Sequence, residues 1–184
     1  MCLWFAAAPG PALAQDTGAP DAGPVLLYSF DDPPKVFTLE GGTFAAENVI
    51  APDHVGWRIT GIDGDAGHNF WPLVDMTETF ADVDTAAVTL KVNEANGADG
   101  FALLLQNNYA ADEQVGLTFE IDLTKLVVGE VVTIDLPLPS PRPDLTQAST
   151  YKLKYYGKKP IDIEVYEFYL PGPDDASEAV DEPD

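Results

Sequence analysis

Apolar and polar residues alternate between Thr85 and Leu138. The alternation covers four stretches, 86–93, 100–108, 116–123 and 131–138, separated by breaks rich in Gly, Asn and Asp. A period of two over about four to eight residues, bounded by turn residues, is typical of half-buried antiparallel strands. Short strands at such regular spacing predict a β-sandwich or a barrel.

The rest of residues 25–170 shows similar short stretches and no sustained helical period. We predict strands at 25–30, 35–39, 43–50, 54–62, 68–74, 86–94, 100–108, 115–123, 130–137, 150–157 and 161–170. The alternating prolines of 137–145 cannot enter a central sheet ladder, so this segment is predicted to be an extended surface connection. The fold class is therefore all-β, an antiparallel β-sandwich.

The alternation also divides the side chains between a core and a polar face. The predicted core residues are Val55, Trp57, Ile59, Val88, Leu90, Val92, Phe101, Leu103, Leu105, Val115, Leu117, Phe119, Ile121, Tyr151, Leu153 and Tyr155. The predicted polar face carries His54, Arg58, Thr60, Thr89, Lys91, Asn93, Gln106, Thr118, Glu120, Asp122, Lys152, Lys154 and Tyr156.

This polar face is the first candidate binding site, with Arg58, Gln106, Glu120 and Lys154 as candidate ligand contacts. Sugar hydroxyls suit such a mixture of donors and acceptors, and an unfilled polar site would leave those groups unpaired. The alternative is a solvated sheet face with cross-strand charge pairs. A one-residue change of register would invert the pattern.

Two aromatic residues beside amides are further candidate contacts. Trp71 lies in the segment GHNFWPL, and Tyr109 follows Asn107 and Asn108 at a strand end. An exposed ring can stack on the C–H face of a sugar while amides bind its hydroxyls. Either residue could instead pack in the core or at its rim, because aromatic residues dominate core energetics.

The composition limits the possible partners. The formal charge of −22 argues against nucleic acid, whose affinity comes from Lys and Arg on phosphates, and against an anionic membrane surface. No segment after the N-terminal region is apolar enough to insert into a bilayer. The chain's 46% hydrophobic content is ample for one domain with a core.

The two ends are predicted to lie outside that domain. Residues 1–14 have the apolar run and small-residue site of a secretory signal peptide, without the usual positive start, so the signal is interpreted as truncated. Residues 15–24 are a flexible linker, and 171–184 form a disordered acidic tail. The only cysteine, Cys2, lies in the signal. Export without disulfides indicates a bacterial secreted or periplasmic protein.

Metal binding would use oxygen ligands. Asp31 and Asp32 end the first predicted strand, and Glu164 and Glu167 lie in the last. Carboxylates and carbonyls suit Ca²⁺, so Asp31, Asp32 and Glu167 are candidate ligands for a structural calcium ion. Zinc is improbable with two histidines.

A catalytic reading is weaker. Glu120 and Asp122 resemble the start of the E-x-D-x-x-E strand motif of laminarinase-type β-glucanases, but the third position falls on Thr124 or Lys125. A retaining mechanism needs an acid there as proton donor. We therefore predict that the chain is not an enzyme.

The strand phrases LLYSFDD, WRITGIDG, VDMT, GFALLLQNN and IDIEVYEFYL lie in this order between residues 26 and 170. In them the chain resembles the galactose-binding-like β-sandwiches that serve as carbohydrate-binding modules. The resemblance implies a jelly-roll fold, frequent structural calcium, and glycan binding on a concave face or at loop tips.

The sequence thus favours a secreted, non-catalytic β-sandwich that binds a polysaccharide or other glycan. The alternative is an extracellular structural domain with a protein partner, and a degenerate polysaccharide-active enzyme is the third interpretation. Fold alone does not decide among these functions.

Overall fold

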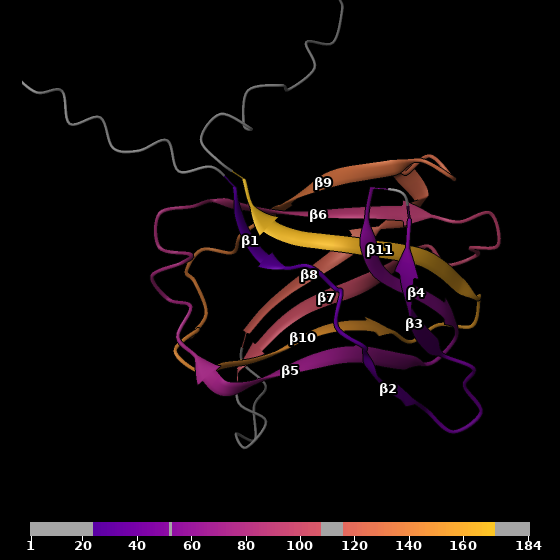
Figure 1. Ribbon diagram of the computed structural model, residues 1–184, viewed down its shortest axis with the longest axis horizontal. Helices are drawn as coiled ribbons and strands as arrows, with labels where there is room; N and C mark the ends of the chain where they lie inside the picture. Colours follow the sequence, from indigo (N-terminus) through magenta and orange to yellow (C-terminus); the bar gives the residue numbers. More distant parts are fainter. Residues whose placement is uncertain (1–23, 52, 108–115, 172–184) are drawn as a thin grey trace, which may run out of the picture.

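The structure is a computed structural model that describes residues 24–51, 53–107 and 116–171, and strands dominate it (Figure 1). The elements are β1 (Val25–Tyr28), β2 (Lys35–Thr38), β3 (Ala45–Ile50), β4 (Val55–Gly61), β5 (Gly64–Val74), β6 (Thr85–Val92), β7 (Gly100–Asn107), β8 (Gly116–Asp122), η1 (Leu123–Lys125), β9 (Val131–Pro137), β10 (Ala148–Tyr155) and β11 (Ile161–Leu170). Each predicted strand is confirmed, although β5 begins at Gly64 instead of residue 68. None of the described residues belongs to a helix that could span a membrane.

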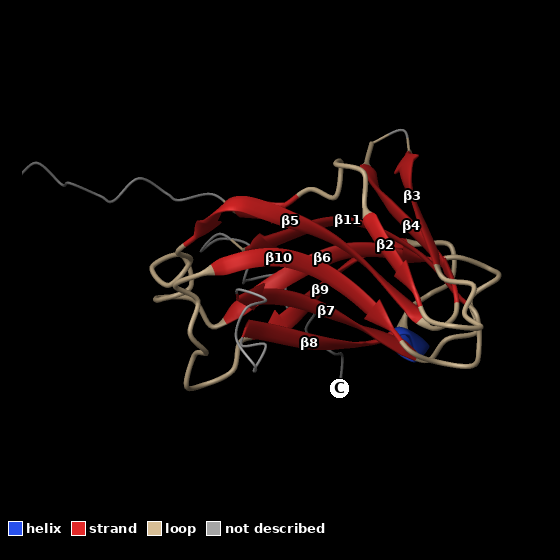
Figure 2. Ribbon diagram, turned by 90° about the horizontal axis from the view of Figure 1, so that it is seen from below, coloured by secondary structure: helices blue, strands red, loops and turns tan. Residues whose placement is uncertain are grey.

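The strands form two antiparallel sheets. Sheet A has the order β3-β4-β11-β6-β9, with β1 also paired to β11. Sheet B has the order β2-β5-β10-β7-β8, and its central strands lie side by side in Figure 2. The two sheets stack as the layers of a sandwich, which confirms the predicted fold class.

An aromatic cluster fills part of the space between the sheets. Trp57 from sheet A is fully buried, and its ring contacts Tyr28 and Phe30, with centroids 5.8 and 5.1 Å away. The Trp57 indole Nε1 donates a hydrogen bond of 2.6 Å to the carbonyl of Asp32, which satisfies its polar atom. Burial of each such side chain stabilises the fold by about 1.5–3 kcal/mol.

The predicted core is confirmed for most of its members, because strand side chains alternate between faces. Val55 is an exception: it begins β4 and is 43% exposed, so its assignment to the core was wrong. Val115 lies outside the described residues. The predicted signal, linker and tail likewise lie outside them, apart from Pro24 and Pro171.

Candidate functional site

The outer face of sheet B brings charged and aromatic side chains together. Cross-strand partners share a face of a sheet. The register therefore aligns one row across the sheet: Phe37, Asp65, Lys154, Ala102 and Glu120, from β2, β5, β10, β7 and β8. The next row consists of Lys35, Gly67, Lys152, Leu104 and Thr118.

A hollow of about 420 Å³, which we call the β7 hollow, lies on this face. Ala102 of β7 has a short side chain and Leu104 is buried, so space remains between the longer side chains of β10 and β8. Lys154 and Tyr156 stand on the β10 side, and Glu120 stands on the β8 side. The complete lining is Gly100, Phe101, Ala102, Leu104, Thr118, Glu120, Ile121, Lys154, Tyr155 and Tyr156.

A buried carboxylate orients the β10 side of the hollow. Asp65 is only 6% exposed, and its Oδ2 accepts a hydrogen bond of 3.3 Å from the Tyr156 hydroxyl. The Lys152 Nζ lies 3.1 Å from the same oxygen. The Lys154 Nζ lies over the Tyr156 ring, 4.8 Å from its centroid. Partial burial, and then the negative charge of Asp65, raises the pKa of Tyr156, so its hydroxyl stays protonated and can donate.

The groups around the β7 hollow suit a polyhydroxylated ligand. Tyr156 is 48% exposed and offers an aromatic ring to an apolar C–H face. Within the described part of the chain, neither Lys154 nor Glu120 forms an ion pair. Lys154 can therefore donate hydrogen bonds to hydroxyl oxygens, while Glu120 can accept them from hydroxyl groups.

Two of the predicted contacts, Glu120 and Lys154, meet at this hollow. Gln106 lies on the same face but is only 6% exposed. Its cross-strand neighbour Thr150 is fully buried and donates a hydrogen bond of 2.9 Å to the Asn69 side chain. This end of the face is therefore less accessible than the end that carries the hollow.

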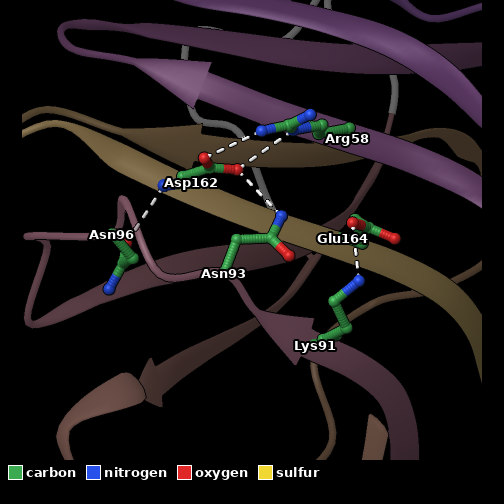
Figure 3. A network of polar contacts seen from close by, with 6 residues as sticks. All are labelled: Arg58, Lys91, Asn93, Asn96, Asp162 and Glu164. Atoms are coloured by element: carbon green, nitrogen blue, oxygen red, sulfur yellow. Dashed lines mark hydrogen bonds and ion pairs between the residues drawn. The ribbon is translucent and has the colours of Figure 1, made fainter. Parts of the chain in front are cut away.

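Arg58 lies in β4 on the outer face of sheet A, and Figure 3 shows its guanidinium beside Asp162. Its guanidinium makes two hydrogen bonds to the carboxylate of Asp162, at 3.1 and 3.0 Å, and Asn93 donates a third at 2.8 Å. Beside them, Lys91 pairs with Glu164 at 2.9 Å. The single polar face that the alternation predicted is thus two faces on opposite sides of the sandwich. Alternation shows which side chains face outward, but not which sheet their strand joins.

In the network on sheet A, each carboxylate is paired with a basic side chain: Asp162 with Arg58, and Glu164 with Lys91. Burial alone would raise the pKa of Asp162 and that of Glu164. Hydrogen bonds from Arg58 and Asn93 to Asp162 hold its pKa below the ordinary value. Bonds from Tyr166 and Lys91 do the same for the pKa of Glu164. These groups are therefore engaged with one another, and the arrangement matches the predicted alternative of a charge-paired sheet face.

The two aromatic candidates lack a described side chain. Trp71 lies in β5, and the position of its side chain is outside what the structure describes. Tyr109 lies outside the described residues altogether. Both stay predictions.

The candidate calcium ligands do not form a cluster. Among residues 24–51, 53–107 and 116–171, no group of three or more His, Cys, Asp or Glu side chains could hold a metal ion. The carbonyls of Asp31 and Asp32 accept hydrogen bonds from Asn48 and Trp57. Glu167 lines a separate hollow on sheet A with Leu26. Calcium binding stays a prediction without geometric support from these residues.

The Glu120 and Asp122 pair does not show the properties of a catalytic dyad. The Asp122 carboxylate accepts hydrogen bonds from the hydroxyl and the backbone amide of Thr124. These bonds, together with Lys125, lower the pKa of Asp122, so Asp122 is not a proton donor, and the third position of the motif, where that donor would stand, holds Thr124 or Lys125. Asp122 therefore acts here as the cap of η1.

Three residues of this face were not among the predicted ligand contacts: Phe37, Asp65 and Tyr156. Tyr156 and Phe37 each lie in a short alternating stretch, so a rule that searches outward positions for aromatic residues would have found them. Phe37 is 57% exposed and stands in the same row as Asp65. The alternation gave no prediction for Asp65, because this residue lies in the Gly/Asp-rich segment between the predicted strands 54–62 and 68–74.

The fold is similar to that of solved carbohydrate-binding modules. The family 11 module of the cellulosomal cellulase Lic26A-Cel5E of Clostridium thermocellum matches with a TM-score of 0.58 at 16% identity, over 82% of this chain and 95% of that module. A family 11 module from Clostridium thermocellum in complex with a β-1,3-1,4-mixed-linked tetrasaccharide gives 0.56 at 14% identity, over 82% and 96%. The xylan-binding module CBM15 gives 0.52 at 11% identity, over 82% and 98%.

No protein-family model and no curated protein sequence matches the chain. At these levels of identity the structural similarity establishes the fold: a β-sandwich of the carbohydrate-binding-module type.

Proposed function

We propose that this chain is a secreted, non-catalytic protein that binds polysaccharide in the β7 hollow. One observation carries the proposal: the half-exposed Tyr156 ring, oriented by Asp65, lines a hollow together with Lys154 and Glu120, neither of which forms an ion pair among the described residues. The same combination of an aromatic surface with a few polar groups is typical of small-ligand sites.

The alternative is a protein-interaction domain. The outer face of sheet A resembles such a structural surface more closely, because its charges are already paired with one another. The β7 hollow differs from that face because Lys154 and Glu120 remain available to a ligand. This difference favours glycan binding.

The test is a binding screen of the full chain against mixed-linkage β-glucan and xylan, with calcium and with EDTA. The ligands of the similar modules suggest these two polymers. Saturable binding to either would support the proposal, and its loss in EDTA would add a calcium requirement. A folded sample that binds no polysaccharide would overturn the proposal in favour of the protein-interaction role.

Tyr156→Ala tests the site itself. Loss of the ring should weaken binding about tenfold, equivalent to about 1.4 kcal/mol, with little change in melting temperature because Tyr156 is half exposed. Tyr169→Ala, which removes an aromatic ring from sheet A, is the matched control and should bind like the wild type. Equal affinities for the two variants would exclude the β7 hollow as the site. Release of reducing sugar by the wild type would contradict the non-catalytic assignment.

A further inference from the structure

A second hollow, also of about 420 Å³, lies where the two sheets meet along one side of the sandwich. We call it the seam hollow, because β8 is the last strand of sheet B in the described order and β9 is the last strand of sheet A. It is lined by residues of β8, of the connection after β8 and of β9, among them Lys125, Leu126, Ile134 and Asp135.

The two hollows share the strand that separates them. Thr118, Glu120 and Ile121 line both. Thr118 and Glu120 are exposed on the outer side of β8. They therefore lie between the two hollows, with the β7 hollow on one side and the seam hollow on the other. A ligand that fills the β7 hollow and contacts Glu120 therefore already reaches the border of the second hollow.

The seam hollow also combines apolar surface with charged groups, although its Lys125 Nζ lies 3.3 Å from the carboxylate of Asp122, which lines the same hollow. Leu126, Ile134 and Pro137 supply apolar surface, while Lys125 and Asp135 supply a donor and an acceptor. An edge strand also has backbone N–H and C=O groups on its outer side that no further strand pairs, and hydroxyl groups can bind to them.

We propose that the glycan site extends across the strands, from Tyr156 and Lys154 over β7 and β8 into the seam hollow, and that the ligand is a linear polysaccharide chain contacted by both hollows. This inference rests on the proposed function. The distance from β10 to β8 is two strand spacings, about 10 Å, and packed sheets lie about 10 Å apart. A path of about 20 Å requires several linked sugars, so a mono- or disaccharide would fill only part of it.

The experiment is an NMR titration of the ¹⁵N-labelled full chain with oligosaccharides of increasing length, cut from the polymer that binds. Short oligosaccharides should shift the amides of Ala102, Leu104 and Lys154. Longer ones should also shift those of Leu126 and Ile134. Affinity should rise with length until both hollows are filled.

Lys125→Ala tests the second hollow by calorimetry. The Lys125 side chain is 80% exposed, so its removal should leave the fold unchanged. We expect a roughly threefold to tenfold loss of affinity for the longest oligosaccharide and no change for the shortest. Glu130→Ala is the control, because Glu130 is an exposed charged residue of the same β8–β9 connection and lines neither hollow.

The outcomes separate the two proposals. If the longest oligosaccharide shifts only the β7-hollow amides and Lys125→Ala binds it like the wild type, the extension is wrong and the proposed function stands. If the folded chain binds neither polysaccharide nor oligosaccharide, the proposed function fails and the extension fails with it. Length-dependent affinity that Lys125→Ala selectively reduces would support both.

Discussion

Charged residues of this protein have two different roles, and their contacts distinguish them. On sheet A, Asp162 and Glu164 are nearly buried and each accepts hydrogen bonds from two side chains. On sheet B, Lys154 and Glu120 line a hollow and have no ion-pair partner among the described residues. Leaving a buried charge without its partner is costly, so the contacts of Asp162 and Glu164 contribute to the stability of the fold. Lys154 and Glu120 are instead available to a ligand.

Asp162→Asn should reveal this stabilising role through its pH dependence. The pKa of Asp162 is lowered in the folded state. Its contribution is therefore fully present above the unfolded pKa, about 3.9, and is lost as pH falls through the folded pKa. We expect the variant to lose about 2 kcal/mol at pH 7 and to show a shallower decline of stability below about pH 5.

Urea unfolding across this pH range measures the effect. Asp82→Asn, which removes an exposed carboxylate from the loop after β5, is the control and should follow the wild-type profile. A decline as steep in Asp162→Asn as in the wild type would show that Asp162 does not contribute to the acid sensitivity.

At the scale of elements, an irregularity in β11 changes which side chains reach the core. Ile163 and Val165 are fully buried, and so is Phe168, although strict alternation would place Phe168 on the opposite face. The register with β6 shifts between Val165 and Glu167, as in a β-bulge, which restores the inward direction for Phe168. The extra residue, Tyr166, stacks on His54 with centroids 4.8 Å apart and donates a hydrogen bond to Glu164.

Gly56→Ala should destabilise this part of sheet A. A Cβ at Gly56 would collide with the carbonyl of Val165 and lie 2.9 Å from Cδ1 of Tyr166. Backbone atoms in a paired strand cannot move far, so we expect a loss of at least about 2 kcal/mol in denaturant unfolding. Gly97→Ala is the control, because its Cβ would meet nothing closer than 3.5 Å. Equal stabilities of the two variants would contradict the close packing of β4 against the bulge.

At the scale of the whole molecule, net charge opposes the compact state. The chain carries 31 acidic and 9 basic residues, a formal charge of −22. Even if all 9 basic residues formed ion pairs, 22 carboxylates would be left without a basic partner. The remaining carboxylates repel one another at distances that salt screens effectively.

The melting temperature should therefore rise by several degrees between 10 mM and 500 mM NaCl, as measured by circular dichroism. A gain of about 1 kcal/mol corresponds to about 2–4 °C for a domain of this size. The same salt series on Asp162→Asn, which lacks the Arg58–Asp162 ion pair, isolates the general effect of screening. If screening of the net charge is the cause, the melting temperature of this variant should rise as well. A melting temperature that falls with salt would show that the ion pairs outweigh the repulsion.

Much of the architecture followed from local pattern. Alternation over short stretches located the strands and most of the core, because the side-chain period of a strand is a property of a few consecutive residues. The same rule identified Glu120 and Lys154 as outward-facing.

Strand pairing between distant parts of the chain decided the rest. It placed β10 between β5 and β7, which brings Lys154 and Tyr156 to the β7 hollow, and it placed β4 beside β11, which pairs Arg58 with Asp162 on the opposite face. Local patterns of apolar and polar residues thus establish which side chains face outward. Which of them share a surface depends on the order of strands in the sheets, and that order is set by contacts between residues far apart in the chain.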